Sequence, residues 1–164
     1  ENERARLEVL DKFINREDVK IVTSLDAIFK YTIPKEKFLE MRIPISSGTE
    51  IEIEKLSKDL VLMGYTKEDM VEGVGQFSVR GGIIDIFSPN YPNPFRIELF
   101  DTEVDSIRFF DEETQRSLEN CMDILIIPTR EAVTSEEDRF RLEEYLVSEK
   151  KKQLKKKRKA SRLN

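Results

Sequence analysis

Residues 76–87, QFSVRGGIIDIF, and residues 95–101, FRIELFD, carry the pattern that decides the fold. In both runs apolar residues alternate with polar or charged ones, which is the period of a β-strand with one buried face. The residues predicted on the buried face are Phe77, Val79, Ile84, Ile86, Phe95, Ile97 and Leu99. The opposite face then carries Ser78, Arg80, Asp85, Arg96, Glu98 and Phe100. The sequence therefore predicts neighbouring strands whose two faces differ strongly in chemistry.

This second face admits two interpretations. Charged side chains on the outer face of a sheet ordinarily meet water and pair across strands. Arginine together with phenylalanine on an exposed face is also the composition of a protein-binding hot spot. The alternation alone does not choose between a solvated face and a binding surface.

The rest of the pattern predicts an α+β fold, an antiparallel meander packed with helices. Further strands are predicted at residues 41–45, 104–110 and 122–127, and helices at residues 3–15, 25–31 and 34–39. Another helix follows Thr49, which forms the expected capping box with Glu52, and it ends at Gly64. Helices, then a run of strands, then a helix is the order typical of α+β proteins.

Three segments are expected along the chain. Residues 1–33, with a short apolar strand at residues 19–23 between two helices, predict the margin of an α/β domain. Residues 34–130 form the α+β domain. Residues 131–164 are predicted as a long helix, opened by a capping box of Thr134 and Glu137, with a basic end. The first residue is glutamate rather than methionine, so we expect a piece of a longer chain.

Charge is distributed unevenly. The 28 basic residues include nine between residues 150 and 164, where there is no acidic residue. Residues 1–149 therefore carry 19 basic against 33 acidic residues, a net charge of −14. Such an acidic body is a poor general binder of DNA, because binding depends on neutralising phosphates. The basic end fits either nucleic-acid binding or a solvated helix end.

Several kinds of chemistry have no residues to support them. The chain has no histidine, no phosphate-binding glycine loop and one cysteine, Cys121, which is expected to be a buried, inert thiol. We expect no metal, no cofactor and no enzymatic activity in this chain by itself. No apolar run is long enough to span a membrane, and the single cysteine fits a reducing cytoplasm.

A family resemblance covers roughly residues 7–135. The matching segments are Gly64-Tyr65 and residues 76–87, 96–111 and 114–119. They resemble the N-terminal module of the bacterial transcription-repair coupling factors, a module that is shared with the excision-repair helicase UvrB. UvrB itself is the close alternative, but it usually carries an arginine at the position of Ser78. The run at residues 101–108 is more similar to the coupling factors.

The resemblance implies a role and a set of contact residues. It implies that residues 34–130 bind UvrA, the damage-sensing ATPase, during transcription-coupled nucleotide excision repair. The UvrA-contacting positions that it implies are Arg80, Arg96 and Phe100, and Glu98 matches a further contact on the UvrB side. Ser78 stands at a contact arginine of UvrB, so that contact is expected to be missing.

The resemblance also implies what the rest of a full-length protein does. Residues 1–33 correspond to the margin of a degenerate helicase-like domain. ATP and Mg²⁺, RNA polymerase and double-stranded DNA are expected to bind through other domains, whose motor motifs are absent from this sequence. The chain itself is expected to be monomeric.

Overall fold

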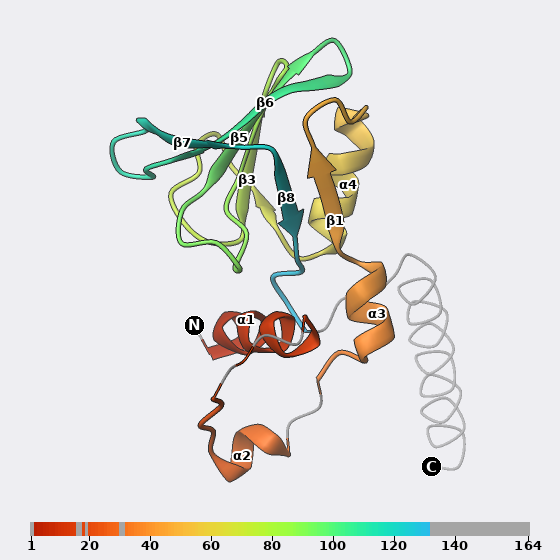
Figure 1. Ribbon diagram of the computed structural model, residues 1–164, viewed down its shortest axis with the longest axis vertical. Coiled ribbons are helices and arrows are strands. Elements are labelled where there is room, and N and C mark those ends of the chain that lie inside the picture. Colours follow the sequence, from red (N-terminus) through yellow and green to blue (C-terminus); the bar gives the residue numbers. More distant parts are fainter. Residues whose placement is uncertain (1, 16–17, 19, 30–31, 132–164) are drawn as a thin grey trace, which may run out of the picture. The chain divides into compact units, whose positions relative to one another are not determined.

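The alternating runs of the sequence form the centre of a six-stranded sheet in the computed structural model, which describes residues 2–15, 18, 20–29 and 32–131. The helices are α1 (Asn2–Ile14), α2 (Leu25–Ile28), α3 (Lys35–Glu40) and α4 (Ile53–Leu62). The strands are β1 (Ile43–Ser46), β2 (Thr66–Lys67), β3 (Gln76–Arg80), β4 (Ile83–Ile86), β5 (Phe95–Phe100), β6 (Glu103–Phe110), β7 (Ser117–Cys121) and β8 (Asp123–Ile126) (Figure 1). The predicted α+β fold is confirmed.

The large sheet is a meander in sequence order from β2 to β7. Its neighbours are antiparallel except for β2 and β3, which run parallel. Tight turns make this order possible: Gly81 at a φ of 59° joins β3 to β4, and Asp101 at a φ of 58° joins β5 to β6. Strand β1 pairs with β8 in a separate two-stranded sheet.

The main core lies on one face of the large sheet. Helix α4 contributes Leu56 and Leu60, and these belong to the same buried cluster as Phe77, Ile84 and Ile97 from the sheet. The helix predicted between Thr49 and Gly64 is thus confirmed, and it spans Ile53–Leu62. Gly64 follows the end of helix α4 and has a φ of 93°. A Cβ atom at this residue would lie 2.8 Å from Thr129 Oγ1. Only glycine fits that position without displacing its neighbours.

Two smaller clusters complete the packing. Leu7 of α1 and Phe38 of α3 are buried together with Ile33 and Ile127. Val71, Phe87 and Phe110 form the third cluster, with Val74 packed against it. Phe87 and Phe110 each follow a residue that packs in the main core, so they lie on the opposite face of the sheet. That face is therefore covered by protein at one end.

Two strands were missed by the sequence analysis. In β7 the first four residues are exposed, and β2 has two residues, both exposed. A strand that is solvated on both faces shows no apolar alternation, so the period-two pattern could not reveal it.

Two expectations at the level of local structure are wrong. Residues 20–23 do not form the predicted strand and are exposed, and they pair with none of the described strands. Helix α4 begins after Glu52, without a side-chain capping bond. Thr49 instead accepts a hydrogen bond from the Ser46 backbone N–H in the turn after β1. The boundaries predicted at residues 33 and 130 stay predictions, and the helix predicted from Thr134 lies outside the described residues.

Two neighbouring residues of α4 test the main core. Leu60 is 0% exposed, whereas Val61, the next residue, is 51% exposed. We expect Leu60→Ala to lower the free energy of unfolding by about 2–5 kcal/mol, because it removes buried contacts and leaves a cavity. Val61→Ala is the matched control and should change it by about 0.5 kcal/mol or less. Urea titration measures both values, and equal values would contradict the assigned core.

Candidate partner-binding surface

The outer face of the large sheet brings side chains from four strands into two rows. Cross-strand partners lie on the same face of an antiparallel sheet. One row runs through Ser78, Asp85, Arg96 and Arg108. The next row runs through Arg80, Ile83, Glu98 and Ser106. Pairing therefore brings together three of the four predicted contact residues, Arg80, Arg96 and Glu98, and it adds Arg108.

Asp85 is the centre of the first row. Its Oδ1 accepts a hydrogen bond from Arg96 Nε at 2.6 Å, and its Oδ2 accepts one from Arg96 Nη2 at 2.8 Å. Arg80 Nη2 also donates to Oδ2, at 2.6 Å. One carboxylate thus accepts hydrogen bonds from both arginines that the sequence singled out.

The prediction that Ser78 and Asp85 lie on an exposed face is wrong. Each of them is 1% exposed. The Ser78 hydroxyl has no hydrogen-bond partner among the described residues. Burial thus supports the expectation, first drawn from the resemblance, that Ser78 makes no contact with a partner.

The turn after β6 reaches this row at Arg96. Asp111 Oδ1 accepts two bonds from Thr114, from its hydroxyl and its backbone N–H, and these bonds lower the pKa of Asp111. The turn places Gln115, at a φ of 58°, so that its amide donates to the Val71 carbonyl and its oxygen lies 3.5 Å from Arg96 Nη2. The segment at Val71 and this turn thus meet beside the guanidinium.

Arg96 is also held by an aromatic ring. Its guanidinium carbon lies 4.7 Å from the centre of the Phe110 ring, a cation–π geometry. The hydrogen bonds that Arg96 donates to Asp85 raise the pKa of Arg96 above its ordinary value. The side chain is only 16% exposed, whereas that of Arg80 is 46% exposed. Arg96 is therefore the inner arginine of the pair and Arg80 the outer one.

Glu98 has partners within its own sheet. Its Oε1 pairs with Arg108 Nη2, and its Oε2 accepts a hydrogen bond from Ser106 Oγ at 3.0 Å. Arg108 was not among the residues singled out from the sequence. The strand predicted at residues 104–110 contained it, but only the register of β5 with β6 places it opposite Arg96 and next to Glu98.

Phe100 lies at the exposed end of β5. The register shifts after Glu98, where Asp105 is an extra residue on β6. Phe100 pairs with Glu103 beyond this irregularity and is 80% exposed. An exposed phenylalanine next to charged groups is an apolar anchor for a partner, because its burial is gained only on binding.

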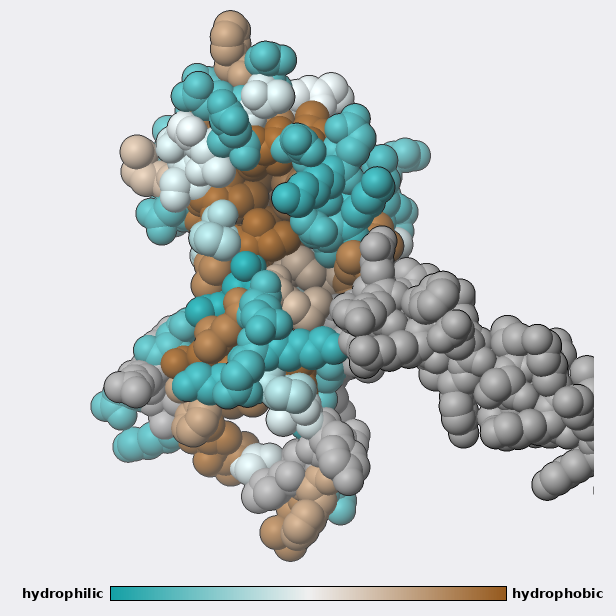
Figure 2. Space-filling view, turned by 90° about the vertical axis from the view of Figure 1, so that its right-hand side faces the viewer, coloured by the Kyte–Doolittle hydropathy of each residue, from teal (hydrophilic) through white to brown (hydrophobic). Residues whose placement is uncertain are grey.

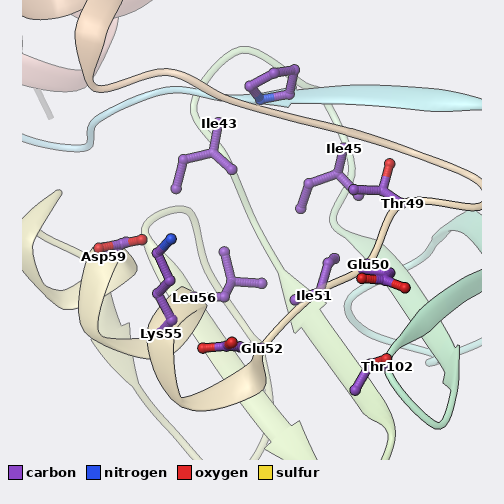
Figure 3. Close-up of a pocket in the computed structure, with 11 residues that line it drawn as sticks. Ile43, Ile45, Thr49, Glu50, Ile51, Glu52, Lys55, Leu56, Asp59 and Thr102 are labelled. Atoms are coloured by element: carbon purple, nitrogen blue, oxygen red, sulfur yellow. The ribbon is translucent and has the colours of Figure 1, made fainter.

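A groove on another side of the molecule is a second candidate site. Apolar surface gathers there in a hollow bordered by polar residues, on the side of β1 and α4 (Figure 2). The groove has a volume of about 430 Å³. Its apolar lining includes Ile43, Ile45, Ile51 and Leu56, and its charged lining Glu50, Glu52, Lys55 and Asp59 (Figure 3). It offers apolar contact rather than a set of reactive groups.

Other chemistry finds little support in the described part of the chain. No three residues of the metal-binding types gather there, and no helix there has the length and apolar character to cross a membrane. Cys121 is half-buried rather than buried, and burial, with Asp123 and Glu119 nearby, raises the pKa of its thiol. It therefore stays protonated and weakly reactive at neutral pH.

Comparison with known proteins decides the family. A family model described as the UvrB interaction domain matches residues 43–131, which is more than half of the chain and includes the whole outer face. The chain belongs to this family. The resemblance stated from the sequence is thereby confirmed.

Relatives of this UvrB interaction domain extend the match. The transcription-repair-coupling factor of Bacillus subtilis is 42% identical over 143 residues, which cover 87% of this chain and 12% of the relative. Those of Staphylococcus aureus strain USA300 and Staphylococcus haemolyticus are 42% and 39% identical, over 76% and 80% of the chain and 11% of each relative. The chain thus spans about an eighth of their length or less.

The basic run after residue 150 lies outside the described residues, so its role stays open.

The stability of the two arginine variants should differ. Arg96→Ala leaves the buried Asp85 carboxylate with Arg80 alone, so we expect the free energy of unfolding to fall by about 3 kcal/mol or more. Arg80→Ala leaves both carboxylate oxygens bonded to Arg96 and should cost about 1 kcal/mol. Urea titration of the two variants measures the difference. A larger loss for Arg80→Ala would contradict the assignment of inner and outer arginine.

Proposed function

We propose that this chain is the protein-recognition module of a transcription-repair coupling factor and recruits UvrA to sites of stalled transcription. The observation that carries the proposal is the exposed Phe100 at the end of β5, the strand that also carries Arg96, which a buried carboxylate holds in place together with Arg80. Family membership and the coupling-factor relatives support it.

The proposed contact combines apolar and charged groups. Phe100 enters an apolar pocket of UvrA, and Arg80 donates to a carboxylate there. Arg96 lies deeper and contributes mainly by its charge and its position. Glu98, paired with Arg108, forms the polar border of the contact and orients that arginine.

The proposed role needs no catalytic group or cofactor in this chain. ATP and Mg²⁺ would serve motor domains elsewhere in the full-length protein, which would also contact RNA polymerase and DNA. Only the UvrB interaction domain region of the family is matched here. Recognition of UvrA is therefore assigned to the outer face alone.

Binding to purified UvrA tests the proposal. Phe100→Ala and Arg80→Ala should each weaken binding by about 2 kcal/mol or more, roughly a thirtyfold rise in Kd, because each removes an anchor of the contact. Leu118→Ala is the matched control: this residue is 53% exposed and lies on β7, which β6 separates from the strand of Phe100. Calorimetric titration measures the three values. Wild-type affinity in both anchor variants would refute the assignment.

A further inference from the structure

Asp85 is buried too deeply to touch a partner, yet it contacts both arginines of the proposed surface. We infer that Asp85 is the positioning residue of this surface, and that it leaves the outward edge of Arg80 to receive a carboxylate of the partner. This inference rests on the proposed function and adds to it the buried residue that positions the contacting arginine.

The geometry of Arg96 makes it the fixed member of the pair. Its Nε and Nη2 point to the two oxygens of Asp85, a bidentate arrangement that determines the plane of the guanidinium. The Phe110 ring, which packs against the face of the guanidinium, and Gln115 beside it restrict the Arg96 side chain further. Arg96 therefore adds positive charge to the surface from one defined position.

Arg80 is the arginine of the pair that can bond to Asp85 and to a binding partner at the same time. Within residues 32–131 it bonds only Asp85, through Nη2, and nearly half of its side chain is exposed. Its Nε and Nη1 are left to donate outward. Because the bond to Asp85 already restricts a long flexible side chain, less conformational entropy is lost when a partner binds.

The charges indicate what the partner must supply. One carboxylate faces two guanidinium groups, so the Asp85 cluster has an excess of one positive charge. Beside Arg80 in the same row lies the half-buried Ile83, and Phe100 is exposed at the strand end. The complementary surface is an acidic side chain at the edge of an apolar pocket.

A double-mutant cycle on the whole chain tests this role, with Kd for purified UvrA as the readout. The variants are Asp85→Asn, Arg80→Ala and the two combined. Asparagine keeps the size of the side chain but replaces one acceptor with a donor. We expect Asp85→Asn to raise Kd at least tenfold alone and less than twofold in the Arg80→Ala background, because its effect passes through Arg80.

The control is Asp105→Asn, the same change at the exposed extra residue of β6, which should leave Kd unchanged. An equal fold-change in both backgrounds would mean that Asp85 acts only on the fold, and would overturn the inference. So would an unchanged Kd for Asp85→Asn. If Arg80→Ala and Phe100→Ala also bind like wild type, the proposed function fails with it, which is a separate result.

Arg80→Lys gives a second test if circular dichroism shows that Asp85→Asn does not fold. Lysine keeps the charge, but its compact ammonium group cannot hold Asp85 with one edge and present a second, oriented edge outward. We expect a loss of affinity close to that of Arg80→Ala. Wild-type affinity of Arg80→Lys would overturn the inference.

Discussion

A buried carboxylate is the constraint on which the outer face of this protein depends. Removing a charge from water is costly unless it is paired and hydrogen-bonded. Asp85 meets that requirement with three bonds, two from Arg96 and one from Arg80. The two arginines are thereby drawn to one point of the sheet. The carboxylate determines where the two arginines lie, and the arginines give the face its positive charge.

The outer face changes in character along the strands. At one end Val71, Phe87 and Phe110 form a small apolar cluster, and at the other Phe100 is open to solvent. The ion cluster of Asp85 lies between them, and Arg96 over Phe110 joins it to the covered end. A partner that binds over Phe100 would cover the same face of the sheet that the cluster of Val71, Phe87 and Phe110 covers at its other end. For this reason the end of the face at Phe100 is the better candidate for recognition than the groove beside α4.

Sequence patterns succeeded where one face of an element is buried and failed where none is. The alternation in β3, β4 and β5 was predicted correctly for their core-facing residues, because Phe77, Ile84 and Ile97 pack against α4. Strand β7 was missed because its first four residues are exposed, so no apolar alternation marks it. Residues 20–23 have strand composition but no pairing among the described strands. A strand needs hydrogen-bond partners, and composition does not supply them.

The sequence by itself determined strands β3 to β6 of the large sheet and the core-facing residues of β3, β4 and β5. Period-two alternation is a local property, so it can be read along the chain. Only the tertiary structure decided that Asp85 is buried, that Arg96 lies inward of Arg80, and that Glu98 pairs with Arg108. Alternation assigns a side chain to a face. It cannot tell whether a distant segment covers that face, or which charges meet across strands.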